Sequence, residues 1–269
     1  MNLREELIQA LITEKISSPR LEADIILKNV APNYPKISSE EEKQVKAMLE
    51  RRLRHEPLDK IIGYREFYKY RFKVSKDVLT PRPDTEILLE KALSLIPQNK
   101  PCRILDLGTG SGCILLSLLK ERPKAEGVGL DKSTKALKIA KENAQLLNVE
   151  NNVQFINKSW NDIDRNKEKF DIIVSNPPYI PSQEIETLDD EVKNYDPKIA
   201  LDGGTTGLKC YTEIATIAPH IMNKDSHILL EVGYNQAKVV ADIFTRVGLK
   251  LIQIEKDLAS IDRCVILKK

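Results

Sequence analysis

The chain has 269 residues, enough for one large domain or two unequal ones. Its 42 Lys and Arg against 40 Asp and Glu give a net charge of +2, so a charge-driven partner must use a local patch. No stretch approaches the roughly 20 apolar residues that span a bilayer, and the N-terminus lacks the pattern of a secretory signal. The four dispersed cysteines form no C-x-x-C and argue against a zinc site or a disulfide framework. We therefore expect a cytoplasmic protein with reduced thiols, no metal and no membrane partner.

The first third of the chain has helical periodicity. Apolar residues recur at three- and four-residue spacing within 3–12, 21–27 and 45–53. Ser18 before Pro19 predicts a helix N-cap, and Ser39 with Glu42 predicts a capping box. From residue 70 to 74 the period becomes two, which predicts a strand, and a further helix follows the proline-rich segment 80–84.

After Pro101, strands alternate with helices, as in a parallel sheet covered on both faces. Strands are predicted at 103–107, 127–130, 153–156 and 170–175, then at 228–232, 249–254 and 263–267, the last two as an antiparallel pair. Helices are predicted at 114–120, 135–147, 208–222 and 235–246. The predicted fold class is therefore α/β, with a seven-stranded Rossmann-like sheet.

A glycine-rich loop joins the first of these strands to its helix. The loop contains Asp106, Gly108, Thr109, Gly110, Ser111 and Gly112. Glycines let the backbone approach a ligand closely, and free N–H groups at a helix start favour an anionic group. A dinucleotide loop has the pattern G-x-G-x-x-G, whereas here the third glycine comes one residue early, so NAD is the weaker alternative. The spacing instead resembles the cofactor loop of Rossmann-like methyltransferases, which implies S-adenosylmethionine as the cofactor.

Asp131 ends the next predicted strand, 19 residues beyond Gly112. A carboxylate at this position can accept hydrogen bonds from both hydroxyls of a ribose. The alternative is a tight strand-to-helix turn beside a solvated carboxylate.

Asn176, Pro177, Pro178 and Tyr179 follow directly on the strand predicted at 170–175. Ligands of parallel sheets bind at the carboxyl ends of strands, and the two prolines stiffen this loop. A planar NH2 group needs two acceptors, which the Asn176 side-chain oxygen and the Pro177 carbonyl can supply, while the Tyr179 ring can lie against its face. The tetrapeptide matches the N-P-P-Y signature of methyltransferases that act on planar amino or amide nitrogens. Taken alone, it also fits a turn beside a buried tyrosine.

Several segments together resemble the HemK-type release-factor glutamine N5-methyltransferases over nearly the whole chain. They are 57–68, 80–86, the glycine loop, 176–181, short motifs between 191 and 208, and 261–263. The resemblance implies a class I methyltransferase sheet with three parts: a helical substrate-docking domain at 1–65, a hairpin linker at 66–84 and an S-adenosylmethionine-binding domain at 85–269. The implied substrate is the glutamine of the Gly-Gly-Gln loop of peptide-chain release factors.

The resulting site has a catalytic group of Asn176, Pro177 and Tyr179. The same tetrapeptide, with Pro178, would contact the substrate, as would Arg82, which stands between two prolines near the expected mouth of the site. The cofactor contacts would be the glycine loop, Asp131, Trp160 and Asn176. An amide nitrogen is a poor nucleophile, so positioning is expected to supply much of the rate enhancement.

Two residues depart from the family pattern. Ser159 stands where many members have an acidic residue that contacts the adenine amino group; Asp162, or the Trp160 ring with backbone groups, are the alternatives for that contact. Ser260 replaces an expected Gly, which we interpret as a local change.

Other features leave alternatives open. A basic run from Lys46 to Lys76 holds ten Lys and Arg against four acidic residues. It is either a solvated face or a docking surface for an acidic protein, with RNA as the less favoured partner. The alternative functions are an N6-adenine or N2-guanine nucleic-acid methyltransferase, which a pI near 8.2 argues against, and a non-catalytic cofactor-binding subunit, which the intact motifs argue against.

We expect a monomer, and we expect His55, His220 and His227 to be structural or surface residues.

Overall fold

The computed structural model describes residues 2–165 and 168–269, which form two compact units. The helical unit comprises Met1–Tyr64 together with Asp189–Tyr195, and the sheet unit comprises Arg65–Leu188 and Asp196–Lys269. The segment 189–195 therefore belongs to the helical unit although both of its flanks belong to the sheet unit.

The sheet unit contains the predicted seven-stranded sheet. Its strands are β3 (Cys102–Leu107), β4 (Ala125–Asp131), β5 (Val153–Asn157), β6 (Phe170–Ser175), β7 (Met222–Glu231), β8 (Lys250–Lys256) and β9 (Asp262–Lys268). The order across the sheet is β5-β4-β3-β6-β7-β9-β8, with β9 antiparallel to both of its neighbours and the other pairs parallel. The prediction of the α/β fold class, including the terminal antiparallel pair, is confirmed.

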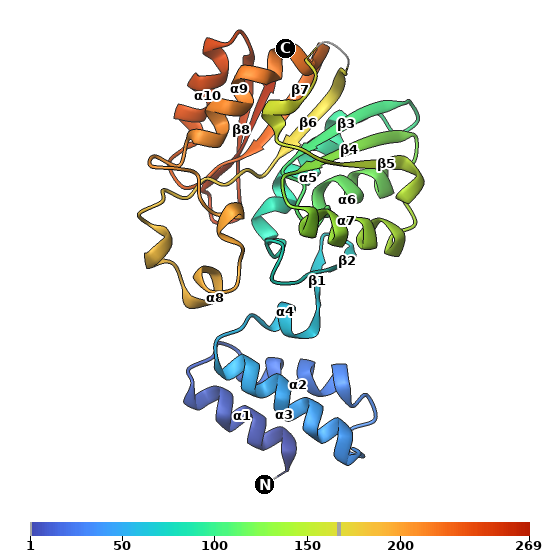
Figure 1. Ribbon diagram of the computed structural model, residues 1–269, viewed down its shortest axis with the longest axis vertical. Coiled ribbons are helices and arrows are strands. Elements are labelled where there is room, and N and C mark those ends of the chain that lie inside the picture. Colours follow the sequence, from blue (N-terminus) through green and yellow to red (C-terminus); the bar gives the residue numbers. More distant parts are fainter. Residues whose placement is uncertain (1, 166–167) are drawn as a thin grey trace. The chain divides into compact units, whose positions relative to one another are not determined.

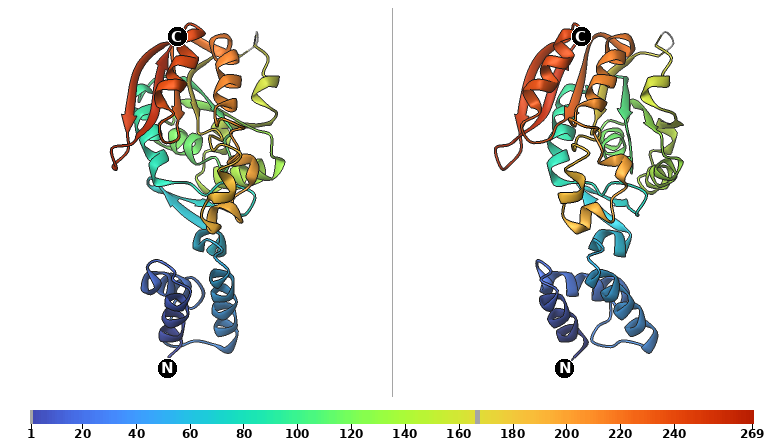
Figure 2. Two further views of the ribbon diagram at one scale, coloured as in Figure 1. Left: turned by 90° about the vertical axis from the view of Figure 1, so that its left-hand side faces the viewer. Right: turned by 60° about the vertical axis from the view of Figure 1, so that its left-hand side comes forward.

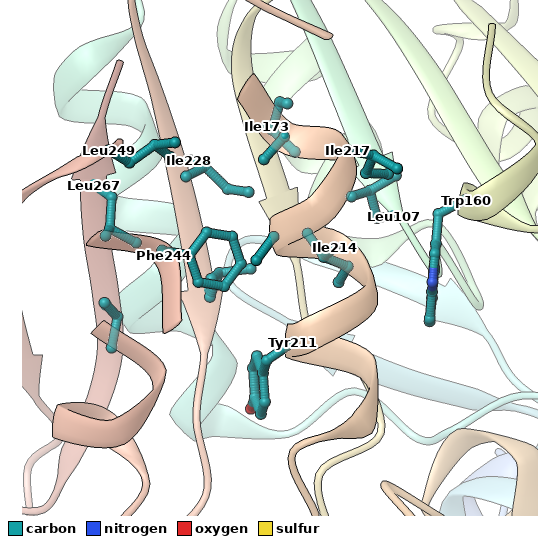
Figure 3. Close-up of a cluster of buried hydrophobic side chains, with 14 of the residues drawn as sticks. Leu107, Trp160, Ile173, Tyr211, Ile214, Ile217, Ile228, Phe244, Leu249 and Leu267 are labelled. Carbon is teal, nitrogen blue, oxygen red and sulfur yellow. The ribbon is translucent and has the colours of Figure 1, made fainter. Parts of the chain in front are cut away.

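Helices cover both faces of this sheet (Figures 1 and 2). They are α5 (Glu86–Leu95), α6 (Cys113–Glu121), α7 (Thr134–Leu146), α9 (Lys209–Ile221) and α10 (Ala237–Arg246). On one face, Ile214 of α9 and Phe244 of α10 pack on strand residues such as Ile173 and Ile228, as Figure 3 shows. On the other face, α5, α6 and the end of α7 pack on Ile104 and its neighbours. Successive strand residues point to opposite faces, so these strands are apolar on both sides.

A two-stranded hairpin of β1 (Tyr64–Phe67) and β2 (Tyr70–Lys73) precedes α5. The buried Asn143 of α7 ties this hairpin to the glycine loop. Its side chain accepts from the Lys73 N–H at 2.7 Å, and its amide donates to the carbonyls of Lys73 and Ser111 at 3.1 and 2.9 Å.

The helical unit is built on three helices that lie side by side in Figure 2. Its elements are α1 (Leu3–Thr13), α2 (Pro19–Val30), α3 (Ser39–Leu53), the short α4 (Leu58–Ile62) and α8 (Asp190–Lys193). Leu7, Leu11, Ile26 and Val45 are fully buried between α1, α2 and α3. The amphipathic pattern read from the sequence therefore gives the core of a small bundle.

One predicted helix N-cap is confirmed in position but lacks a side-chain bond, and the predicted capping box needs correction. α2 does begin at Pro19, but Ser18 adopts a left-handed φ of 64° and its side chain makes no capping hydrogen bond. The capping box consists of Ser38 and Glu41 instead of Ser39 and Glu42. Both pairs fit the S-x-x-E pattern, and the earlier pair lets Ser39 join the helix.

Arg52 of α3 is a buried charge of the helical unit. Its guanidinium donates to Glu22 of α2 at 2.6 and 3.1 Å and to Glu191 of α8 at 2.7 Å, with only 2% of the residue exposed. Nearby, the Tyr195 hydroxyl donates to the Arg54 carbonyl at 2.7 Å. These bonds attach the segment 189–195 to the bundle.

Arg52→Ala is expected to lower the free energy of unfolding of the helical unit by about 3–5 kcal/mol, because Glu22 loses its buried partner. Hydrogen exchange of α1–α3 amides under denaturant measures this. The matched control, Arg54→Ala, removes an exposed side chain at the end of α3 and should stay within about 0.5 kcal/mol of wild type. Equal destabilisation by both variants would contradict the structural role of Arg52.

Candidate active site

A pocket of about 360 Å³ lies at the carboxyl ends of β3, β4 and β6 in the sheet unit. This volume is in the range of small-molecule sites. Of the residues predicted for the site, the pocket is lined by Arg82, Gly108, Thr109, Gly110, Ser111, Asp131, Trp160, Asn176 and Pro178. Asp106, Gly112, Pro177 and Tyr179 lie outside this lining. The sequence prediction therefore located the pocket. It did not separate the residues that line the pocket from the residues behind them.

The glycines of the loop are needed for its backbone conformation. Gly108, Gly110 and Gly112 have φ values of 78°, 56° and 81°, which L-residues rarely adopt. A Cβ on Gly110 would meet nothing within 4 Å, whereas one on Gly112 would come within 2.8 Å of Leu116. Gly110 therefore leaves space in the pocket, and Gly112 lets the loop pack on α6.

Four backbone N–H groups of the loop, ahead of the start of α6, already have partners within the protein. Gly108 and Thr109 both donate to the Leu130 carbonyl at 2.9 Å, and Gly112 donates to Thr109 at 2.8 Å. Gly110 donates to the Asp131 carboxylate at 2.9 Å. Three of these donors bind β4 and the fourth binds the loop itself, so these four N–H groups are not free for a ligand.

Two carboxyl groups stand on either side of the loop. Asp131 accepts from the Gly110 and Ser133 N–H groups, one on each oxygen, and burial raises its pKa. Each oxygen keeps a further lone pair that can accept from a hydroxyl. Asp106 lies beneath the loop, 1% exposed, where it accepts from the Thr109 hydroxyl at 2.7 Å; burial raises its pKa to about 7. Asp106 therefore supports the loop from below.

Trp160 forms one wall of the pocket. It begins the 3₁₀ turn Trp160–Asp162, and its indole N–H donates to Glu213 of α9 at 2.9 Å. Lys132 lies over the indole ring, 5.3 Å from its centroid. Glu213 lines the pocket and Asp162 does not, so the carboxyl beside Trp160 comes from α9. Only the tertiary structure brings it there, since 53 residues separate the two.

Asn176 occupies the pocket wall where β6 ends. The preceding residue, Ser175, donates from its hydroxyl to the Leu107 carbonyl at 2.6 Å, which links the ends of β6 and β3. The Asn176 side-chain nitrogen donates to the Thr85 hydroxyl at 3.3 Å. Its oxygen is therefore the part of the amide left for a ligand.

The next residues of the motif are more enclosed. The Pro177 carbonyl accepts no hydrogen bond from the residues that the structure describes. The Tyr179 ring packs at the edge of the core, its hydroxyl donates to Glu231 at 3.4 Å, and its carbonyl accepts from Gln236 at 2.9 Å. Burial raises the pKa of Tyr179 well above its ordinary value, so this hydroxyl remains a donor.

Arg82 lies on the pocket wall and is fixed by an ion pair. Its guanidinium donates to the Asp196 carboxylate at 2.9 Å, and the Asp196 side chain is only 2% exposed. Two residues on, the 3₁₀ turn Lys198–Ala200 forms the adjoining wall. The Arg82 side chain itself is 44% exposed and remains accessible to a ligand.

The lining includes residues that the sequence analysis missed. They are chiefly Thr80, Thr85, Lys132, Lys158, Lys198, Lys209 and Glu213. Thr85 lies within the segment 80–86 that carries the family resemblance, and Lys132 directly follows Asp131. Their position in or beside a motif could therefore have indicated that they line the pocket. Lys209 and Glu213 gave none, because they lie on a helix with ordinary amphipathic spacing. None of the three histidines lines the pocket, and the described part of the chain has no group of three or more metal-ligating side chains.

The basic run is largely paired in the structure. Arg51 pairs with Glu56, Lys69 with Glu121, and Lys73 with Glu142. These pairs favour the interpretation as a solvated face over that of a concentrated basic patch. Among the described residues, no helix is long and apolar enough to cross a membrane.

The polar groups of the pocket suit a nucleoside with a charged extension. Asp131 offers acceptors to a ribose, and Trp160 offers a flat face to a base. The open space at Gly110 leaves room for the charged extension of the nucleoside. Arg82 and the four lysines of the lining can face a carboxylate. The residues present therefore fit the cofactor implied by the glycine loop.

Comparisons with known proteins agree with this geometry. A family model described as a methyltransferase domain matches residues 98–239. The chain is 44% identical to the release factor glutamine methyltransferase of Thermodesulfovibrio yellowstonii, over 87% of this chain and 84% of that protein. It is 40% identical to the protein of the same name from Caulobacter vibrioides, over 88% of this chain and 82% of the relative. Among solved structures, a methyltransferase from Pyrococcus furiosus shares the fold, with a TM-score of 0.53 at 15% identity over 74% of this chain and 88% of that one.

Asp131→Ala is expected to weaken the binding of S-adenosylmethionine by about 1–3 kcal/mol, because the acceptors of the ribose are lost and Gly110 loses its partner. Calorimetric titration with the cofactor or its demethylated product measures this. Asp131→Asn keeps one acceptor oxygen and should lose less. Unchanged affinity in the alanine variant would remove Asp131 from the cofactor site.

Proposed function

The chain belongs to the family of release factor glutamine methyltransferases, and we propose that it methylates the side-chain amide nitrogen of the glutamine in the Gly-Gly-Gln loop of peptide-chain release factors. S-adenosylmethionine would supply the methyl group, as an electrophilic carbon on a sulfonium. One observation above all supports the proposal: Asn176, whose side-chain nitrogen is bound to Thr85, lines the same pocket as Asp131, Trp160 and the glycine loop.

The residues proposed to hold the cofactor are those of the pocket's β3–β4 side. Asp131 would accept from the ribose hydroxyls, and Trp160 with Glu213 would contain the base. This arrangement supplies the acidic group that Ser159 lacks, from a different element. Gly108–Ser111 would surround the remainder of the molecule, and Asp106 and Gly112 would support that loop from behind.

The residues proposed to act on the glutamine are those that follow β6. The Asn176 oxygen and the Pro177 carbonyl would accept the two N–H bonds of the target amide, which holds the nitrogen in one orientation. As the nitrogen takes the methyl group it would gain positive charge, which both acceptors would stabilise more strongly than in the ground state. One of its two protons would then pass to solvent, which leaves the neutral methylated amide. Tyr179 and Pro178 would set the shape of this loop, since the Tyr179 hydroxyl and carbonyl are both tied to neighbouring elements.

The helical unit is proposed to dock the release factor. It matches the N-terminal part that the resemblance assigns to substrate docking, and the chain of this unit returns at 189–195, directly before Asp196 of the pocket's ion pair. Release factors act on ribosomes, so we propose that the protein works in the cytoplasm, and as a monomer. Nucleic acid is not favoured as the substrate, because the basic run is paired with carboxylates.

Asn176→Ala is expected to keep cofactor affinity and to lose turnover by about 10²- to 10³-fold, because one preorganised acceptor of the amide is removed. Single-turnover methylation of a release factor, with cofactor titration alongside, measures both quantities.

Asn176→Asp is the matched variant. It keeps an acceptor oxygen and should retain more activity than Ala, whereas a donor role for Asn176 would make the two variants equally poor. A release factor whose loop glutamine is replaced should not be methylated. Methylation of that replaced protein would refute the glutamine assignment.

Arg82→Ala should lower kcat/KM for an intact release factor by about tenfold or more, because a charged contact is lost and Asp196 loses this partner. Arg82→Lys keeps the charge without the planar fork and should recover only part of the activity. Kinetics with intact release factor test this, and wild-type kcat/KM for the alanine variant would show that Arg82 contributes nothing to turnover.

A further inference from the structure

Glu231 is a buried carboxyl that the proposed mechanism does not use. It ends β7, is 2% exposed and lies outside the pocket lining. Leu230 pairs with Ser175 in the register of β7 and β6, so Glu231 and Asn176 are the next residues on two neighbouring parallel strands. Their side chains therefore leave the same edge of the sheet.

The hydrogen bonds around Glu231 lead back to the N-P-P-Y motif by two routes. Its Oε1 accepts from the Tyr179 hydroxyl at 3.4 Å, while Oε2 is buried without a partner among the described residues. The carboxyl also interacts with the Thr85 hydroxyl, and Thr85 in turn accepts from the Asn176 side-chain nitrogen at 3.3 Å. Thr85, which itself lines the pocket, thus stands between Glu231 and Asn176.

The direction of these bonds depends on the charge of Glu231. A carboxylate can only accept, so in its interaction with Glu231 the Thr85 hydroxyl can act only as the donor. The lone pairs of Thr85 then accept from Asn176, which fixes the amide with its nitrogen inward and its oxygen toward the pocket. A protonated Glu231 removes this constraint, because the acid can donate to Thr85 and the Thr85 proton can turn to the Asn176 oxygen.

We propose that Glu231 is a positioning residue that acts through Thr85, and that its carboxylate form holds the Asn176 amide oxygen toward the target glutamine. The inference rests on the proposed function, since it explains how the Asn176 acceptor is oriented.

The surroundings of Glu231 bring its pKa close to neutral pH, where enzymes work. Burial raises its pKa to about 7, although interaction with Thr85 and the charge of Arg263 on β9 oppose the shift. The other titratable groups that interact with it are Asp84, Cys113, Tyr179, Tyr211 and Cys264. Burial raises the pKa of each of these cysteines and tyrosines above its ordinary value, so they stay neutral near pH 7. Activity should therefore rise as the pH rises through about 7 and Glu231 loses its proton.

The test measures kcat between about pH 6 and 9 with saturating cofactor and release factor. With both ligands saturating, kcat reports the groups that titrate in the complex with cofactor and release factor. The wild type should show an acid limb, and Glu231→Gln should lose it, with kcat at about pH 8 lower by roughly 10- to 100-fold, in analogy with residues that orient metal ligands. Cofactor affinity should not change. Wild-type kcat in Glu231→Gln, or an unaltered acid limb, would overturn the proposal.

Variants of Thr85 keep the test decisive if Glu231→Gln fails to fold. Thr85→Val removes the hydroxyl and should reproduce the loss of kcat and of the acid limb, whereas Thr85→Ser should restore both. Full turnover in Thr85→Val would overturn the proposal. His227→Gln is the matched control: this residue is also on β7, and burial lowers its pKa, but it should leave the acid limb in place.

A second readout needs no methyl transfer. The Asn176 side-chain amide signals in a ¹⁵N spectrum should shift with the same midpoint as the Glu231 carboxyl carbon, and Thr85→Val should abolish the coupled shift. An Asn176 amide that is insensitive to Glu231 would refute the relay. If no release factor is methylated while the coupled shift is present, then the proposed function fails and the positioning role stands.

Discussion

The pairing of β3 with β6 is the constraint on which the site depends. The chain runs outward from β3 through β4 to β5, then returns to place β6 on the other side of β3. At such a reversal the loops that follow the two strands diverge and leave a crevice at the sheet edge. The glycine loop follows β3 and Asn176 follows β6, so the reversal brings together two motifs that are distant in the chain. The hydrogen bond from Ser175 to the Leu107 carbonyl fixes this junction within the core.

Two buried carboxyls stand behind the two motifs. Asp106 lies under the glycine loop, and Glu231 lies behind Asn176 and Tyr179. Burial raises the pKa of each to about 7, and each has one oxygen without a partner among the described residues. Such groups are costly to bury, so a core built for stability alone would not favour them. Their positions indicate that they contribute by orienting the loops above them.

The helical unit includes a segment that sequence order alone would assign elsewhere. Residues 189–195 follow the N-P-P-Y loop, yet they join the helical unit through Arg52, whose guanidinium also holds Glu22. The chain consequently passes between the two units three times, after Tyr64, after Leu188 and after Tyr195. The last of these passages leads directly into the carboxylate that pairs with the arginine on the pocket wall.

The sequence by itself determined the elements and the chemistry of the motifs. Apolar periodicity marked the seven strands and the main helices, and the glycine loop, Asp131 and Asn176 marked the pocket, because these features depend on residues close together in the chain. Local sequence could not choose between two adjacent serines as a helix cap, since both fit the same pattern. Only the tertiary structure decided that a neighbouring strand takes three N–H groups of the glycine loop, that Glu213 stands beside Trp160 and that Glu231 stands behind the N-P-P-Y loop. Those contacts join residues on different elements, and strand order and register, which local sequence does not encode, bring them within hydrogen-bonding distance.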